Sequence, residues 1–307
     1  MKTKLKLLLI WLIALSVVIF TSYQAYCRYQ DIALKKMLLE KRKAAWSDLE
    51  IKLKQRALSF KGTVGLVVKD LDTGWQIDLN QGRLMPSASL VKIPIMLAFF
   101  YADREGKVSL KKELYLKNND KVAGSKVLGN LPTGSRFTVE ELFNPMITQS
   151  DNAAANALIS LMGFDKLNDY FKRIGLKNTN LARKMMDFSR RKSGVENYTT
   201  AADCAYLFDQ LYAGNFLSED VSRRCLEILG GQKINDRIPR KLPKASVFVA
   251  HKTGLERHIC HDVGIVFTPK GDFLICVLVK HGDKTARNAK KLIANIALLT
   301  YNYYCNN

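Results

Sequence analysis

The sequence has few residues of the kinds that bind metals or form redox centres. Its six cysteines are scattered with no C-x-x-C pair, and it has only four histidines. Zinc knuckles and dithiol redox sites need such residues at fixed short spacings, so the pattern indicates neither. The one cluster of metal-ligand types is His258, Cys260 and His261, and adjacent loop residues rarely complete a site without further partners. We therefore predict no metal and no cofactor.

Acidic side chains are scarce relative to basic ones. The chain carries 48 Lys and Arg against 28 Asp and Glu, which gives a formal net charge of +20. Such a charge attracts nucleic acid or anionic surfaces. No zinc-finger spacing, RRM signature or basic helix with interleaved aromatics accompanies it, so we expect no nucleic-acid partner. The charge is either a plain solvated surface or one that attracts anionic lipid or cell-wall polymer.

Charge is missing altogether from one stretch near the N-terminus. A basic segment, residues 1–6, precedes residues 7–23, which carry no charged side chain. These 17 residues would span about 25 Å as a helix, slightly less than a bilayer core. Cleavage is disfavoured because Tyr23 stands where an A-x-A site needs a small residue, and Tyr26 precedes Cys27 where a lipoprotein needs one. We predict an uncleaved transmembrane anchor; the alternative is the apolar core of a cleaved signal peptide.

The remainder of the sequence predicts a stalk and one large domain. Residues 24–46 predict a basic helical stalk, with apolar positions such as Leu34 and Leu38, that lies against the membrane surface. Basic residues flank the apolar stretch on both sides, so charge alone does not orient it. We expect the folded domain over residues 47–305, beginning at Ser47, where S-D-L-E has the form of a helix-capping box. Internal repeats and low-complexity tracts are missing.

Strand signals occur at both ends of this domain and helix signals occur between them. β-branched and aromatic residues, with turn residues between the segments, predict strands at residues 63–69, 75–79, 246–251, 262–268 and 272–280. Periodic apolar positions with capping residues predict helices at Thr138, from Ser150 to Leu161, Asp165 to Ile174, Thr200 to Tyr212 and Lys284 to Tyr304. The fold class is therefore α/β (α+β). An antiparallel sheet flanked by helices would come from residues 47–100 and 245–305, an all-helical lobe from residues 101–244, and the active site would lie in the cleft between them.

Three short motifs occur in a fixed order. They are S-x-x-K at Ser89–Lys92, S-D-N at Ser150–Asn152 and K-T-G at Lys252–Gly254. A spacing of three residues on a helix puts the Ser89 hydroxyl and the Lys92 amine on one face, and a nucleophilic serine needs a base within hydrogen-bond reach.

Two other stretches fit S-x-x-K, Ser109–Lys112 and Ser189–Lys192, and we interpret both as solvated turns. Ser89 differs from them because Pro86, Ser87 and Ala88 lead into it and an apolar run follows.

With this ordered triple the chain resembles the class A β-lactamases and the related penicillin-binding proteins. The resemblance covers roughly residues 47–305. It implies an acyl-enzyme at Ser89, with Lys92 as the base, its pKa lowered by burial and by Lys252. Ser150 would bridge the two lysines and relay the proton to the leaving nitrogen.

The same resemblance assigns residues to substrate binding. Asn152 would hydrogen-bond the substrate amide, Thr253 and Lys252 would take its carboxylate, and Gly254 would let its backbone approach without a Cβ in the way. The backbone N–H groups of Ser89 and Leu255 would form the oxyanion hole. Arg257 is a further candidate for holding a carboxylate.

The chain departs from the class A pattern at the glutamate that activates the deacylating water. If Arg183 is the basic residue of the corresponding loop, Met185 or Met186 stands where that glutamate belongs, and a thioether cannot act as a base. Asp187 either replaces the glutamate or pairs with Arg183 to close the loop. We expect Glu196, the other carboxylate nearby, to support a helix start.

These observations predict a membrane-anchored serine hydrolase with its catalytic domain on the periplasmic or extracellular side. Its substrates would be β-lactams or the D-alanyl peptides that they mimic, and the resemblance implies β-lactam hydrolysis as the main activity. One alternative is a D,D-peptidase or penicillin-binding protein with slow deacylation. The other is a non-catalytic, membrane-anchored cell-wall binding protein.

Overall fold

The computed structural model describes residues 2–306, which form two compact units, residues 2–51 and residues 52–306. A single helix, α1 (Lys2–Leu58), runs through the whole first unit. It is long and apolar enough near its start to cross a membrane. The predicted helix start at Ser47 is wrong, because Ser47 lies inside α1 and its hydroxyl donates to the carbonyl of Lys43. The predicted anchor and stalk are therefore one unbroken helix.

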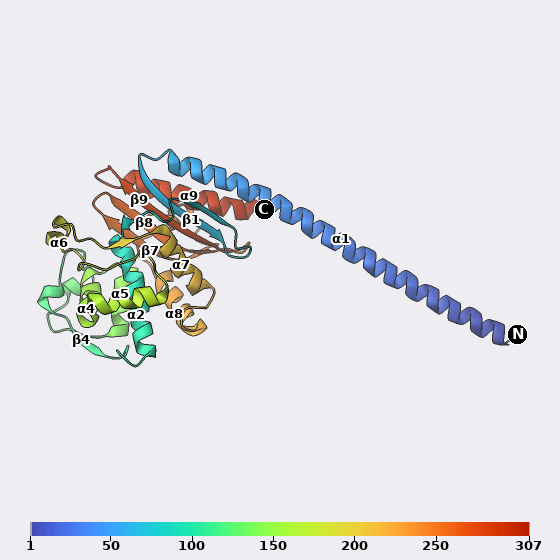
Figure 1. Cartoon of the computed structure of the whole chain (residues 1–307), viewed down its shortest axis with the longest axis horizontal. Coiled ribbons are helices and arrows are strands. Elements are labelled where there is room, and N and C mark those ends of the chain that lie inside the picture. The colour runs from blue at the N-terminus through green and yellow to red at the C-terminus, as the bar shows by residue number, and fades with distance from the viewer. Residues whose placement is uncertain (1, 307) are drawn as a thin grey trace. The chain divides into compact units, whose positions relative to one another are not determined.

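The second unit is built on a five-stranded antiparallel sheet with the strand order β2-β1-β9-β8-β7 (Figure 1). The first and last segments of the domain thus lie side by side, since β1 pairs with β9 along its whole length. The strands are β1 (Gly62–Asp70), β2 (Gln76–Leu79), β7 (Phe248–Glu256), β8 (Ile259–Phe267) and β9 (Phe273–His281). The sheet predicted from the two ends of the domain is confirmed.

Helices cover both faces of this sheet, which explains why β8 and β9 are buried almost throughout. Phe273 stacks on Tyr304 of α9 (Arg287–Asn306), whereas Cys276 lies against Cys204 of α7 (Ala201–Tyr212). Residues 273 and 276 point to opposite faces, because side chains alternate along a strand. At one edge of the sheet β7 has no further strand beside it, so every second backbone N–H along that edge lacks a strand partner.

The middle of the chain forms the helical lobe. Its long helices are α2 (Lys92–Arg104), α3 (Val139–Thr148), α4 (Asn152–Met162), α5 (Phe164–Ile174) and α8 (Glu219–Gly230). The shorter elements are η1 (Ala88–Val91), η2 (Asn118–Asp120), η3 (Leu128–Asn130), η4 (Ile238–Lys241), α6 (Phe188–Lys192), β3 (Met85–Pro86) with β6 (Tyr198–Thr199), and β4 (Glu113–Tyr115) with β5 (Arg136–Thr138). Residues 92–100 of α2 are all buried, so this helix is the centre of the lobe.

Local capping was predicted well at some helix ends and missed at others. The reciprocal cap between Thr138 and Glu141 is confirmed at the start of α3. The predicted start of α4 at Ser150 is wrong, because the Asp151 carboxylate accepts from the N–H of Ala154 at 3.0 Å and caps the helix instead. Ser150 is thereby left just outside α4, in the loop that precedes it.

Candidate active site

Three segments that are far apart in the sequence meet at the free edge of β7. The 3₁₀ turn η1 carries Ser89 and packs on β7 so closely that a Cβ added at Gly254 would lie 3.3 Å from the Cβ of Ala88. The K-T-G motif lies inside β7, which continues to Glu256, rather than at a strand end as predicted. A side chain at position 254 would therefore crowd both η1 and His261 of β8, in addition to the substrate approach that the sequence indicated.

The hydroxyl of Ser150 lies between two lysines. Lys92 Nζ and Lys252 Nζ lie 3.3 Å and 3.1 Å from Ser150 Oγ. Lys92 also donates to the carbonyl of Ser150 and to Oδ1 of Asn152, both at 2.7 Å. Ser150 has a φ of 58°, in the left-handed region, so the loop presents its hydroxyl and its carbonyl to the same ammonium group. The S-x-x-K, S-D-N and K-T-G motifs are thus joined by direct contacts.

Both lysines are fully buried, and burial changes their acidity. Burial lowers the pKa of Lys92 to about 7, although the negative charges of Asp151 and Glu256 oppose the shift. Burial also lowers the pKa of Lys252 well below its usual value, and the positive charges of Lys92 and Arg237 lower it further. A buried amine with a pKa near neutrality is partly unprotonated at pH 7 and can therefore accept a proton.

Ser89 lies in η1, three residues before Lys92, and is partly exposed. Side chains at positions i and i+3 of a 3₁₀ turn are eclipsed, so the Ser89 hydroxyl and the Lys92 amine lie on one side of the backbone. Ala88, directly before Ser89, has a φ of 46°, a conformation that L-residues adopt at a cost. The turn therefore places the partly exposed Ser89 on the same side of the backbone as the buried Lys92.

Asn152 connects this lysine to the wall of the site. Its Oδ1 accepts from Lys92, and its Nδ2 donates to the carbonyl of Ala123 at 2.7 Å. Both ends of the Asn152 amide are thus occupied within the protein, and this residue fixes the position of the Lys92 ammonium.

Two further predicted residues lie on β7. Thr253 is buried in this strand, while Leu255, two residues on, is half exposed at the sheet edge.

A buried ion-pair network holds the loop after α5 against β7. Arg183, whose side chain is 1% exposed, contacts Glu196 at 2.6 Å and Glu256 at 3.1 Å. Arg191 contacts the same two carboxylates at 3.0 Å and 2.9 Å. The expectation that Glu196 supports a helix start is wrong, because Thr200 is the N-cap of α7 and Glu196 binds these arginines instead. The pairs fasten the loop to β7 just beyond the K-T-G motif.

Met185 lies in this loop at a fixed position. It is buried, its N–H donates to Asn156 Oδ1 at 2.8 Å, and its carbonyl accepts from Asn156 Nδ2 at 3.2 Å. Asn156 follows Asn152 by one turn of α4. The backbone of Met185 is therefore held one helical turn from Asn152, which contacts Lys92. Sequence reasoning did not predict this role of Asn156, because Asn156 belongs to no motif.

Asp187 has a local structural role in this loop. Its carboxylate accepts from Ser189 Oγ at 2.6 Å and from the N–H of Arg190 at 3.1 Å, and it caps α6. These two hydrogen bonds lower the pKa of Asp187. The predicted pairing of Asp187 with Arg183 is wrong, because Glu196 and Glu256 hold that guanidinium. Within residues 179–197 and β7, then, each carboxylate is engaged by an arginine or a helix cap.

Two arginines near the site differ in burial. Arg257, the predicted carboxylate ligand, is exposed in the turn after β7, and its Nε donates to Nε2 of the neighbouring His258 at 3.2 Å. Arg237, just before η4, is 1% exposed and close enough to Lys252 to lower its pKa. Its Nη1 lies 3.2 Å from Asp236 without a well-directed hydrogen bond. Sequence reasoning missed Arg237 because no motif marks it, and only its burial in the fold identifies it.

The residues of the His258–His261 cluster point to different surroundings. His261 is buried in β8, where Nε2 lies 2.9 Å from the carbonyl of Pro86 and Nδ1 accepts from the N–H of Val279. Burial lowers the pKa of His261 to about 4, so it is neutral at pH 7. Cys260 contacts Arg237. Across residues 2–306, no group of three or more His, Cys, Asp or Glu side chains is arranged to hold a metal ion.

The chain is similar over most of its length to proteins of known class. A family model described as the beta-lactamase enzyme family matches residues 48–304. Beta-lactamase VEB-1 of Pseudomonas aeruginosa is 25% identical over 285 residues, which cover 86% of this chain and 92% of that protein. Beta-lactamase CARB-3 of the same organism is 26% identical over 211 residues, covering 68% of this chain and 73% of that protein.

Solved structures give the same result for the fold. A β-lactamase from Sphaerobacter thermophilus DSM 20745 superposes with a TM-score of 0.76 at 29% identity, covering 85% of this chain and 98% of that one. PBP-A superposes with a TM-score of 0.77 at 29% identity, covering 85% and 97%. A mutant of PBP-A has been solved as an acyl-enzyme complex with penicillin G. The predicted class A β-lactamase-like fold is thus confirmed.

Proposed function

Because the chain belongs to the beta-lactamase enzyme family, we propose that it is a serine hydrolase that forms an acyl-enzyme at Ser89 with β-lactams and releases it slowly. The observation that carries the proposal is the contact of two buried lysines with the Ser150 hydroxyl, one of those lysines lying three residues after the partly exposed Ser89. Buried amines with lowered pKa values are typical of proton-transfer sites rather than of structural ion pairs.

Acylation proceeds by proton transfer through these groups. Neutral Lys92 takes the proton of Ser89, whose oxygen attacks the carbonyl carbon of the lactam. The N–H groups of Ser89 and Leu255 stabilise the oxyanion, and loss of one such donor typically costs about 10² to 10³ in rate. When the C–N bond breaks, Ser150 passes a proton to the leaving nitrogen and recovers one from the lysines that contact it.

The substrate carboxylate is bound at the other side of Ser150. Thr253 and Lys252 lie there on β7, and Arg237 supplies a buried positive charge behind them. Arg237 takes this role better than Arg257, which lies in an exposed turn. Asn152 Oδ1 accepts from Lys92, so a hydrogen bond from the substrate amide to Asn152 shares this oxygen with Lys92.

Release of the acyl group is slow because no base stands beside the ester. Met185 occupies the position at which a glutamate is expected, and the loop carboxylates Glu196 and Glu256 are held by arginines. Asp187, the candidate substitute, caps α6 and faces Ser189. We therefore favour a penicillin-binding protein or D,D-peptidase that acts on D-alanyl peptides. Rapid β-lactam hydrolysis is the second candidate, favoured by the similarity to named β-lactamases.

Incubation of the purified full-length protein with a labelled penicillin separates these functions. A covalent adduct that persists for many minutes supports slow release, and rapid turnover without accumulation supports a β-lactamase. If neither an adduct nor turnover is observed, the enzymatic proposal is overturned, and a non-catalytic cell-wall binding protein is the remaining function.

The rate of acylation should depend on pH through Lys92. Its pKa is about 7 and only its neutral form accepts a proton, so the second-order acylation rate should rise with pH, reach half its maximum near pH 7 and level off above. Stopped-flow measurements with a chromogenic cephalosporin from pH 5 to 9 test this. Lys92→Ala should lose both the rate and the inflection; an unchanged profile in that variant would exclude Lys92 as the base.

Arg237 and Arg257 offer a matched pair of substitutions. Arg237→Gln should lower the acylation efficiency by about 10- to 100-fold, because it removes a buried positive charge behind the residues that bind the substrate carboxylate. Arg257→Gln, in the exposed turn, should change it less than about threefold. A penicillin methyl ester, which lacks the carboxylate, should react equally with wild type and Arg237→Gln. If Arg257→Gln has the larger effect, Arg257 and not Arg237 is the arginine that interacts with the substrate carboxylate.

We also propose that α1 anchors the protein, with the catalytic domain on the periplasmic or extracellular side. Residues 7–23 are apolar, and the helix continues without a break through residues 24–46. An unbroken helix that crosses a bilayer cannot also bend to lie in its surface, so the stalk leaves the membrane along the same axis. The basic surface remains a candidate for contact with anionic lipid or cell-wall polymer.

A further inference from the structure

A cavity of about 420 Å³ lies in the helical lobe, at the ends of two helices that begin in the active site. Helix α2 begins at Lys92, and its residue Ala102 lines the cavity; α4 begins at Asn152, and its last residue, Met162, also lines it. Ten residues along each helix correspond to about 15 Å. The cavity is therefore separate from the Ser89 site, and its volume falls within the range of small-molecule sites, about 300 to 1,000 Å³.

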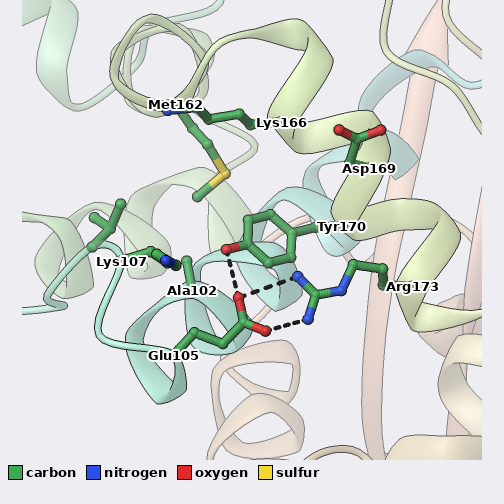
Figure 2. A pocket seen from close by; sticks show the side chains of 9 residues that line it. Ala102, Glu105, Lys107, Met162, Lys166, Asp169, Tyr170 and Arg173 are labelled. Carbon is green, nitrogen blue, oxygen red and sulfur yellow. Dashed lines mark hydrogen bonds and ion pairs between the residues drawn. The ribbon is translucent and has the colours of Figure 1, made fainter.

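The inner wall of the cavity is apolar and aromatic. Ala102, Met162 and Tyr170 are buried and face it, as Figure 2 shows for the methionine and the tyrosine ring. The exposed side chains Lys107 and Lys166 stand at its edge. Such a cavity fits a molecule with a flat apolar part and a polar end.

One of the two acidic side chains that line the cavity, Glu105, is neutralised by a close ion pair. The Glu105 carboxylate accepts from two nitrogens of Arg173 and from the Tyr170 hydroxyl (Figure 2). The hydrogen bond from Arg173 holds the pKa of Glu105 below its usual value. Asp169 also lines the cavity; its side chain is 71% exposed and lies 3.9 Å from Lys172, which is outside the lining.

Two positive charges are left without such partners. The ammonium groups of Lys107 and Lys166 make neither a hydrogen bond nor an ion pair with any of residues 2–306, and no dashed line reaches them in Figure 2. The cavity thus combines an apolar wall with two exposed lysines and one exposed carboxylate, Asp169, at its mouth.

We propose that this cavity is a second ligand site, for a small aromatic carboxylate. The ring lies against Tyr170 and Met162, and the carboxylate meets Lys107 and Lys166. This site is independent of the acylation chemistry proposed for Ser89.

Calorimetric titration of the full-length protein in lipid nanodiscs with 2-naphthylacetate tests the proposal, with empty nanodiscs as the reference. The neutral 2-naphthylacetamide has nearly the same shape, so it measures the apolar part alone. We expect saturable binding of the acid, about 5- to 10-fold tighter than that of the amide, because two exposed ion pairs form. Lys166→Glu and Lys107→Glu should remove this preference. The control Lys177→Glu changes an exposed lysine just after α5 and outside the lining, and it should keep the preference.

A further variant separates this site from the active site, which also binds carboxylates under the proposed function. Lys252→Met should bind 2-naphthylacetate as the wild type does, since Lys252 lies at the other ends of the two helices. Loss of binding in Lys252→Met would place the probe in the active site and overturn the proposal. Absence of saturable binding, equal affinity for acid and amide, or wild-type preference in Lys166→Glu and Lys107→Glu would also overturn it.

Discussion

Ser89→Ala should abolish covalent labelling by penicillin, a loss of about 10⁶-fold in the acylation rate, because no other group can form the ester. The hydroxyl lies in η1, partly exposed and on the same side of the backbone as the Lys92 amine. Removing one oxygen atom from this turn should leave the fold intact. Labelling followed on a gel, with the site located by mass spectrometry of tryptic peptides, measures the result.

The chain supplies its own controls for this substitution. Ser109 and Ser189 also stand three residues before a lysine, but both are exposed, the first in a turn and the second in the short helix α6. Ser109→Ala and Ser189→Ala should label like the wild type. Persistent labelling of Ser89→Ala, or loss of labelling in either control, would show that the sequence pattern led us to the wrong serine.

Met185→Glu should shorten the life of the penicillin adduct by about 100-fold or more, because general-base catalysis of the attacking water typically contributes about 10² to 10⁴. The backbone of Met185 is fixed by two hydrogen bonds to Asn156, one helical turn from Asn152. A glutamate at this position therefore starts from a backbone that the two hydrogen bonds already hold in place. Release of labelled penicilloate after removal of free penicillin measures the adduct lifetime.

Two variants distinguish base catalysis from a loosened loop. Met185→Gln has the same length as Met185→Glu and no base, so it should keep the long-lived adduct. Met186→Glu introduces the carboxylate one residue later, where the backbone is left-handed with a φ of 63°, and should also release slowly. Equal lifetimes for Met185→Glu and Met185→Gln would contradict the explanation for slow release. Thermal unfolding of each variant checks that the buried carboxylate has not melted the loop.

Much of the fold could be predicted because its signals are local. Runs of β-branched and aromatic residues marked β1, β8 and β9, and the reciprocal cap at Thr138 and Glu141 marked α3. Two helix starts were predicted wrongly. Ser150 and Asp151 both have capping side chains, and only packing decides that Asp151 caps α4; Ser47 has a capping sequence inside a helix that has no break there.

The site was predictable only as far as its motifs extend. Ser89, Lys92, Ser150 and Lys252 each lie in a short pattern, and the contacts of Ser150 with both lysines agree with those patterns. Arg237, Asn156 and Glu256 lie in no pattern, because their roles come from contacts between segments 23 to 73 residues apart. Such pairings depend on how the loop and the strands meet, which residue order alone does not reveal.

The left-handed backbone at Ser150 limits how this position can change during evolution. Threonine also carries a hydroxyl, but a β-branched side chain is strongly disfavoured at a φ of 58°. Glycine and asparagine tolerate that conformation and lack the hydroxyl. Substitution of Ser150 is therefore costly in either direction. Threonine keeps the alcohol but strains the backbone, whereas glycine and asparagine suit the backbone but remove the alcohol. Backbone geometry and chemistry together favour serine at this position.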